Sequence, residues 1–178
     1  MGRDRQTGDT ASAYEHQLLL VLRTLPHSSS TDAVAVVLSR FGDHARGWVA
    51  LAAVGAVLDR NRWVQWLSAA VAAAVTEQTS RQIKKAVRRP RPELGGLPAL
   101  AGVTSQYSFP SSHTATAVAA IYTFDGLLPA RVRPGLIAWA ALTAISRPYL
   151  GVHYPSDVAF GAVLGYAIGR ATSALRGE

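Results

Sequence analysis

Two histidines and one aspartate in the second half of the chain have the types and spacing that catalysis needs. His153 and Asp157 are four residues apart, across a predicted junction between a loop and a helix. A carboxylate at this spacing can accept the proton of one imidazole nitrogen, which fixes the tautomer and leaves the other nitrogen as a nucleophile. His113 lies at the start of a different predicted helix, where it is free to protonate a leaving oxygen.

Cationic and hydroxyl groups accompany these three residues. Lys84, Arg91 and Arg147 can neutralise about three phosphate charges, and each arginine can make bidentate contacts. Ser111 and Ser112 open the helix that carries His113, and they add hydroxyls to its free amide N–H groups, which favour an anion. These residue types together predict a phosphoryl-transfer site.

The acidic residues argue against a bound metal. No carboxylate cluster that could hold Mg²⁺ is predicted, because the acids of this region are dispersed: Glu77, Glu93, Asp125 and Asp157. Three nearby cations would oppose zinc on the two histidines and Asp157. The absence of Cys excludes a disulfide framework, an iron–sulfur cluster, a thiol nucleophile and a Cys-based zinc site. We therefore expect no metal and no cofactor.

The composition indicates a folded, unusually apolar chain. Its 178 residues include 18 Lys and Arg and 11 Asp and Glu, for a net charge of +7. The apolar fraction of 49% excludes disorder, and the charged fraction of 16% lies well below the roughly 25% of an ordinary soluble domain. The length fits one domain. We expect a mobile polar tail over residues 1–12 and a single domain over residues 13–178.

Apolar stretches without strand alternation predict an all-α protein. The expected helices cover residues 15–25, 32–41, 47–58, 63–87, 111–129, 134–146 and 157–175. None contains 18 uninterrupted apolar residues, so the stretches fit buried helices of a soluble protein as well as membrane spans. The lengths favour the membrane, since a 25-residue helix is about 37 Å long and a 19-residue helix about 28 Å. We expect a polytopic membrane helical bundle.

Short loops between the last four predicted helices decide where the site lies. Residues 129–133 and 147–156 are too few for long crossings, so neighbouring helices should be antiparallel. The carboxyl ends of helices 63–87 and 134–146 then meet the starts of the other two. All the residues with catalytic or anion-binding chemistry therefore come to one face of the bundle.

Three short motifs carry a family resemblance. Lys84-x6-Arg91-Pro92, Pro110-Ser111-Ser112-His113 and Ser146-Arg147-x5-His153-x3-Asp157 resemble the signature motifs of the type 2 phosphatidic acid phosphatase (PAP2) superfamily, which includes vanadium haloperoxidases and bacterial class A acid phosphatases. Ser112 replaces the usual glycine, but a backbone N–H remains there. The resemblance implies a chloroperoxidase-like four-helix core with additional N-terminal helices.

The resemblance also implies a role for each motif residue. His153 attacks phosphorus and becomes a phosphohistidine, Asp157 orients His153, and His113 protonates the leaving group. The phosphoryl oxygens are held by Lys84, Arg91, Ser111, Ser112 and Arg147. The small size resembles bacterial prenyl-phosphate phosphatases, either undecaprenyl-diphosphate phosphatases or actinobacterial decaprenylphosphoryl-phosphoribose phosphatases. The Ala-, Arg- and Val-rich composition, typical of a high-GC genome, favours the second subgroup.

Other functions compete with this interpretation. A phosphatidic acid or phosphatidylglycerophosphate phosphatase, a soluble acid phosphatase and a vanadium haloperoxidase would share the pocket. A non-enzymatic binder of nucleic acid or another anion would explain the net charge of +7 but not the histidines. We expect a lipid phosphate substrate and membrane lipids as partners, and no nucleic acid. The oligomeric state stays open.

The positive-inside rule favours an active face on the extracytoplasmic side of the cell membrane, provided that the six basic residues of the 81–91 block, which would then lie outside, are discounted as catalytic. That orientation leaves three basic pairs on the cytoplasmic side: Arg60/Arg62, Arg131/Arg133 and Arg170/Arg176. Several polar residues outside the motifs are expected to have ordinary roles. Arg88 and Arg89 should attract an anionic surface, Glu77 should pair with Arg81, and Asp125 with Arg131. The remaining histidines are expected at the surface: His16, His27 and His44.

Overall fold

The computed structural model describes residues 3–24 and 27–177, and the side chains from residue 13 onward within these ranges. Its α-helices are α1 (Arg3–Thr24), α2 (Ser29–Gly42), α3 (Arg46–Leu58), α4 (Trp63–Val87), α5 (Ser112–Thr123), α6 (Arg133–Tyr149) and α7 (Pro155–Leu175). Three short 3-10 turns join them: η1 (Asp43–Ala45), η2 (Arg60–Arg62) and η3 (Ala130–Val132). The expectation of an all-α protein is confirmed.

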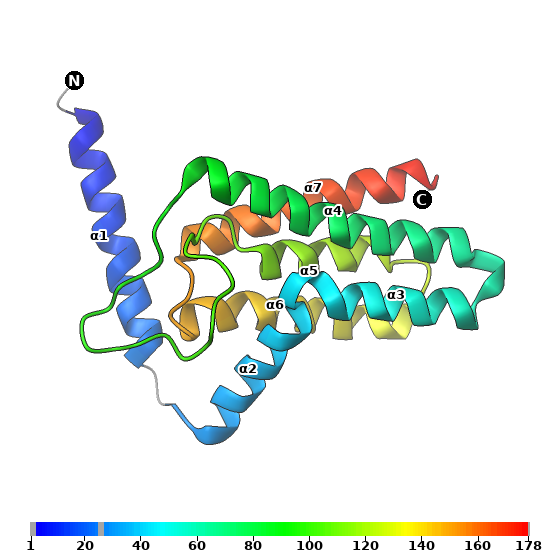
Figure 1. Ribbon diagram of the computed structural model, residues 1–178, viewed down its shortest axis with the longest axis horizontal. Coiled ribbons are helices and arrows are strands. Elements are labelled where there is room, and N and C mark those ends of the chain that lie inside the picture. Colours follow the sequence, from blue (N-terminus) through cyan, green and yellow to red (C-terminus); the bar gives the residue numbers. More distant parts are fainter. Residues whose placement is uncertain (1–2, 25–26, 178) are drawn as a thin grey trace.

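The helices form an elongated bundle with an irregular cap at one end. Helices α3 to α7 run along the long axis, whereas α2 crosses obliquely and α1 lies steeply across the end (Figure 1). The loop over residues 88–111 occupies the same end as α1, beside the carboxyl end of α4 and the starts of α5 and α7. This end is the one to which the sequence assigns the site.

Helix boundaries differ from the expected ones where local chemistry intervenes. Helix α4 has the expected bounds, but α5 ends at Thr123 instead of residue 129, because the chain turns at Gly126 with φ of 75°. Helix α7 begins two residues early at Pro155, whose fixed φ suits a first helical position. Helix α1 extends back to Arg3 through most of the stretch assigned to a polar tail. The mobility of residues 1–12 stays a prediction.

Aromatic side chains and alanines fill the middle of the bundle. Trp48 and Trp66 are buried and pack on Phe124 at centroid distances of 6.0 Å and 5.7 Å. These two tryptophans are therefore core residues, while Trp63 is exposed at the start of α4. The remaining buried positions of this cluster are mostly alanines, so the helices approach closely and rigidly.

Glycines let α7 lie directly against α5. Gly161, Gly165 and Gly169 recur every four residues along one face of α7, and a Cβ built at each would press on the α5 chain. At Gly165 the added carbon would overlap the carbonyl oxygen of Ala115. The close packing fixes the starts of both helices side by side, where His113 and Asp157 lie.

Large apolar side chains cover much of the outer surface. On the long helices they include Val54, Val57, Leu67, Val71, Val75, Ile137, Leu142, Ile145, Phe160 and Val163. Within residues 3–24 and 27–177, α7 is the one helix long and apolar enough to cross a membrane by hydropathy. Helix α4 is long enough but has a polar second half, and α5 spans only about 18 Å.

Replacing Gly165 tests the close packing. Gly165→Ala should lower the free energy of unfolding by about 1–3 kcal/mol, because the methyl group forces α7 away from α5. Gly135→Ala is the matched control, since this exposed helical glycine has open space around it. It should be neutral or stabilise by up to about 1 kcal/mol. Thermal unfolding of the purified variants in one detergent measures both, and equal melting temperatures would contradict the packing argument.

Candidate active site

A polar cavity of about 430 Å³ opens at the capped end of the bundle. Its walls come from η1, the second half of α4 and the loop over residues 102–107. Six of the eight residues that the sequence assigns to the site line it together: Lys84, Arg91, Ser112, His113, Arg147 and His153. Asp157 lies behind His153, and Ser111 lies beneath the start of α5.

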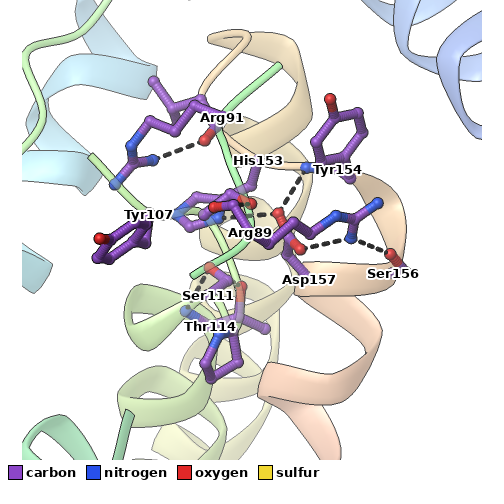
Figure 2. Close-up of polar contacts among 12 residues, drawn as sticks. Arg89, Arg91, Tyr107, Ser111, Thr114, His153, Tyr154, Ser156 and Asp157 are labelled. Carbon is purple, nitrogen blue, oxygen red and sulfur yellow. Dashed lines mark hydrogen bonds and ion pairs between the residues drawn. The ribbon is translucent and has the colours of Figure 1, made fainter. Parts of the chain in front are cut away.

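His153 and Asp157 form a buried pair at the start of α7. His153 Nδ1 is 3.4 Å from Asp157 Oδ2, and the side chains are 2% and 0% exposed. The backbone N–H of Tyr154 donates to the same carboxylate oxygen at 2.9 Å (Figure 2). Asp157 therefore holds Nδ1, and His153 Nε2 is the nitrogen left for a reaction. Burial, followed by the charges of Arg147, Lys84 and Arg91, lowers the pKa of His153 well below its usual value and keeps the ring neutral.

Arg89 is a contact of Asp157 that sequence reasoning missed. Its guanidinium donates to Asp157 Oδ1 at 2.7 Å and to the Ser156 hydroxyl at 2.6 Å, and it lies 4.0 Å from the centre of the Tyr154 ring (Figure 2). Glu15 of α1 accepts from Arg89 Nη2 at 2.6 Å and from the Ser156 N–H at 2.7 Å. The interpretation of Arg89 as a general attraction for anions is therefore wrong. Its side chain is hydrogen-bonded to the Asp157 carboxylate, and no short sequence motif predicts this contact.

Arg147 and Arg91 bring two guanidinium groups to the cavity. Arg147 is 2% exposed, and its Nε and Nη1 atoms are buried with no hydrogen-bond partner in the part of the chain that the structure describes. Arg91 donates from Nε to the Ser105 carbonyl at 2.7 Å and from Nη1 to the Val152 carbonyl at 2.6 Å. Burial lowers the pKa of Arg91 to about 10, so the group stays charged at neutral pH. A buried, unpaired guanidinium beside a cavity is matched to an anion.

Lys84 contributes charge from beneath the cavity. Its ammonium donates to the carbonyl oxygens of Tyr107 (3.4 Å), Ser108 (2.8 Å) and Pro110. These three acceptors take all the N–H donors of an ammonium group. Lys84 therefore anchors the segment that leads into α5, and its effect on a bound anion comes mainly from its charge.

His113 has a carboxylate partner that the sequence did not predict. Its Nε2 lies 3.0 Å from the Ser39 carbonyl and 3.1 Å from Asp43 Oδ1. A carbonyl only accepts, so Nε2 carries the hydrogen and Nδ1 is the nitrogen available for proton transfer. The hydrogen bond from His113 is the leading cause that lowers the pKa of Asp43, which keeps this carboxylate ionised. The two residues are 70 positions apart in the sequence, so no local sequence pattern predicts their contact.

The two serines have different places. Ser112 lines the cavity at the first turn of α5. Ser111 is fully buried, and its hydroxyl caps α5 by accepting from the Thr114 N–H at 3.5 Å and contacting the Thr114 hydroxyl at 3.0 Å (Figure 2). Ser111 does not line the cavity, so its role as a phosphate ligand stays a prediction.

Polar residues outside the motifs agree with expectation in part. The predicted ion pair of Glu77 with Arg81 is present at 2.8 Å, and the partly exposed His44 lies beside this pair at the cavity. Asp125 pairs with Arg133 at 3.4 Å instead of Arg131. His27 is bound to Asp32 at 2.9 Å. No group of three or more His, Asp or Glu side chains placed to hold a metal ion occurs among the residues whose positions are described.

Known proteins are similar to this chain in sequence and in fold. The family model described as the PAP2 superfamily matches residues 65–178. Decaprenylphosphoryl-5-phosphoribose phosphatase of Mycobacterium tuberculosis is 39% identical over 147 residues, which cover 82% of this chain and 80% of that protein. The enzyme of the same name from Mycolicibacterium smegmatis is 40% identical over 131 residues, which cover 71% of this chain and 69% of that protein.

A solved structure supports the same grouping. The transmembrane PAP2-type phosphatidylglycerolphosphate phosphatase of Bacillus subtilis superposes with a TM-score of 0.78 at 20% identity, covering 94% of this chain and 86% of that one. At this identity the likeness shows the fold, whereas the family match and the mycobacterial relatives add the chemistry. The chain belongs to the PAP2 superfamily and is a phosphatase that hydrolyses phosphate esters.

Proposed function

We propose that the protein is an integral-membrane phosphatase that removes a terminal phosphate from a polyprenyl-type lipid, with decaprenylphosphoryl-phosphoribose as the first candidate substrate. The cavity carries this proposal: Arg147 presents buried, unpartnered guanidinium nitrogens beside the neutral ring of His153. The mycobacterial relatives supply the candidate lipid. Undecaprenyl diphosphate, phosphatidic acid and phosphatidylglycerophosphate are the alternative substrates.

The reaction is a double displacement at phosphorus. His153 Nε2 attacks the phosphorus atom, the bond to the leaving oxygen breaks, and His113 gives that oxygen a proton. Arg91, Arg147 and the charge of Lys84 stabilise the negative oxygens in the transition state. Water activated by His113 then attacks the phosphohistidine, which releases inorganic phosphate and restores both rings.

The outer surface supports a place in the cell membrane. Soluble monomers rarely expose apolar patches as extensive as those along α3, α4, α6 and α7. A soluble acid phosphatase or haloperoxidase would not need them. The basic residues of η2 and η3 lie at the end opposite the cavity, which fits a multi-pass protein whose active face is extracytoplasmic.

The two histidines should respond differently to the leaving group. His153→Ala removes the nucleophile, so hydrolysis of both a prenyl phosphate and p-nitrophenyl phosphate should be abolished. His113→Ala removes the acid, which a good leaving group such as p-nitrophenolate needs little. Its loss of kcat/KM should be at least about tenfold smaller on the aryl phosphate than on the lipid. Measuring kcat/KM for folded variants on both substrates decides this, and parallel losses for both variants would sink the division of roles.

Arg89 should act through Asp157 as a positioning residue. Arg89→Gln should lower kcat by about 10- to 100-fold with little change in KM, because the carboxylate loses its anchor but the cavity keeps its cations. Arg89→Lys should restore part of the rate. Arg88→Gln is the matched control, since the Arg88 side chain donates to the Lys85 carbonyl and does not reach the site. A rise in KM alone, or an equal effect at both positions, would contradict this role.

Catalysis should need no divalent metal. Cations of the protein already neutralise the phosphoryl group, so steady-state hydrolysis should survive dialysis against EDTA with less than about a twofold change. The measurement compares rates before dialysis, after it, and after addition of Mg²⁺ or Zn²⁺. Complete loss that either metal restores would overturn the mechanism.

A further inference from the structure

The junction between α2 and α3 forms a cradle for the ring of His113. His113 Nε2 lies 3.0 Å from the Ser39 carbonyl and 3.1 Å from Asp43 Oδ1. Gly42 lies beside the same ring, since a Cβ built there would come within 2.6 Å of His113 Cδ2. A carbonyl oxygen, bare backbone and a carboxylate thus surround one edge of the ring. The cradle lies outside the three sequence motifs and before residue 65, where the match to the PAP2 superfamily begins.

The turn that carries Asp43 has an unfavourable backbone conformation. His44 and Ala45 are successive non-glycine residues with φ of 55° and 58°. Such left-handed positions are sparsely populated and persist where the surroundings impose them, often beside functional sites. Here the core imposes them, because Phe41 packs on Trp48 at a centroid distance of 5.0 Å and Ala45 is fully buried. The turn is therefore held on both sides of Asp43.

The Asp43 carboxylate binds the ring instead of capping a helix. An aspartate just before a helix commonly accepts hydrogen bonds from the first backbone N–H groups of that helix. At α3 the N-cap position belongs to Ala45, and the Asp43 carboxylate accepts from His113 Nε2. The side chain of Asp43 is therefore directed to α5 and away from the end of the neighbouring helix.

A general acid in this cavity needs a negative partner. Before it gives up a proton, the ring of His113 carries a proton on each nitrogen and a positive charge. Three cations line the same cavity: Lys84, Arg91 and Arg147. They disfavour a further positive charge, whereas a carboxylate 3.1 Å from the ring favours it. The Ser39 carbonyl can orient the ring, but it carries no net charge and cannot replace Asp43 in this respect.

We propose that Asp43 is the positioning residue of the acid: it holds His113 Nε2 and stabilises the protonated ring, so that Nδ1 gives its proton to the leaving oxygen. As the bond from His153 Nε2 to phosphorus forms and the bond to the leaving oxygen breaks, the Nδ1 proton moves to that oxygen and the His113 ring becomes neutral. The water that attacks the phosphohistidine then returns a proton to Nδ1. This inference rests on the proposed function and adds to it a residue from outside the motifs.

Two substrates that differ in their leaving groups test this role on the full-length protein in detergent. The readout is the ratio of kcat/KM for farnesyl phosphate to kcat/KM for p-nitrophenyl phosphate. Asp43→Asn keeps the size and an oxygen acceptor but removes the charge, so it should lower this ratio by at least about tenfold. Asp43→Glu restores a carboxylate, and its ratio should be at least about threefold above that of Asp43→Asn.

A double variant and a matched control complete the experiment. Asp43→Asn combined with His113→Ala should give the ratio of His113→Ala alone within about twofold, because Asp43 acts only through that ring. Asp32→Asn is the control, since it also breaks an aspartate–histidine pair, that of Asp32 with His27 at 2.9 Å, and neither residue lines the cavity. Its ratio should stay at the wild-type value.

Because the readout is a ratio within one preparation, a fraction of inactive protein does not alter it. An unchanged ratio in Asp43→Asn, beside a lowered ratio in His113→Ala, would overturn the role of Asp43 and leave the proposed function standing. Additive losses in the double variant, or an equal loss in the Asp32 control, would also overturn that role. If His113→Ala left the ratio unchanged, or if the wild-type protein hydrolysed neither substrate, the proposed function would fail, and this inference with it.

Discussion

Positive charge held away from bulk water beside His153 is the constraint on which the rest of the site depends. A buried cation is costly unless acceptors or an anion surround it. The loop between α4 and α5 supplies part of these acceptors, because the carbonyl oxygens of Ser108 and Pro110 accept from Lys84 and that of Ser105 accepts from Arg91. Arg147 keeps two buried nitrogens without an acceptor in the described chain, and the phosphoryl group of the proposed substrate would supply one. On this proposal, substrate binding completes an electrostatic arrangement that the fold leaves open.

Such an arrangement requires a scaffold that cannot relax around the unpaired charge. The glycine face of α7 against α5 provides it, because the α7 backbone at Gly165 and Gly169 lies directly against carbonyl oxygens and Cβ atoms of α5. The start of α7 is secured from the other side by α1, where Glu15 binds both Arg89 and the Ser156 amide. The N-terminal helix thus belongs to the support of the site, even though none of its described side chains, from residue 13 onward, lines the cavity.

The sequence predicted the fold class, the common face and most of the lining because these follow from local patterns. Apolar stretches, short loops and motif spacing act over a few tens of residues. Three features escaped because they join distant segments: Asp43 with His113, Glu15 with Arg89, and His44 with Arg81. The short α5 escaped for a local reason, since the Asp125-Gly126 turn interrupts an otherwise apolar stretch. The place of these residues in the site, outside any sequence motif, is therefore visible only from the tertiary contacts.

Each of the two histidines of the proposed site, His153 and His113, has an aspartate partner, yet the two carboxylates affect their imidazole rings differently. Asp157 is already bound to Arg89 at 2.7 Å and to a backbone N–H, so most of its charge is compensated before it meets His153 at 3.4 Å. It can orient a neutral ring without making that ring basic. Asp43 is 35% exposed, and the ring of His113 is its ion-pair partner at 3.1 Å. Its charge is directed to the ring that, in the proposed mechanism, must carry a proton. The proposed division between nucleophile and acid is therefore consistent with what else each carboxylate binds, and the identity of the His–Asp pair alone does not set it.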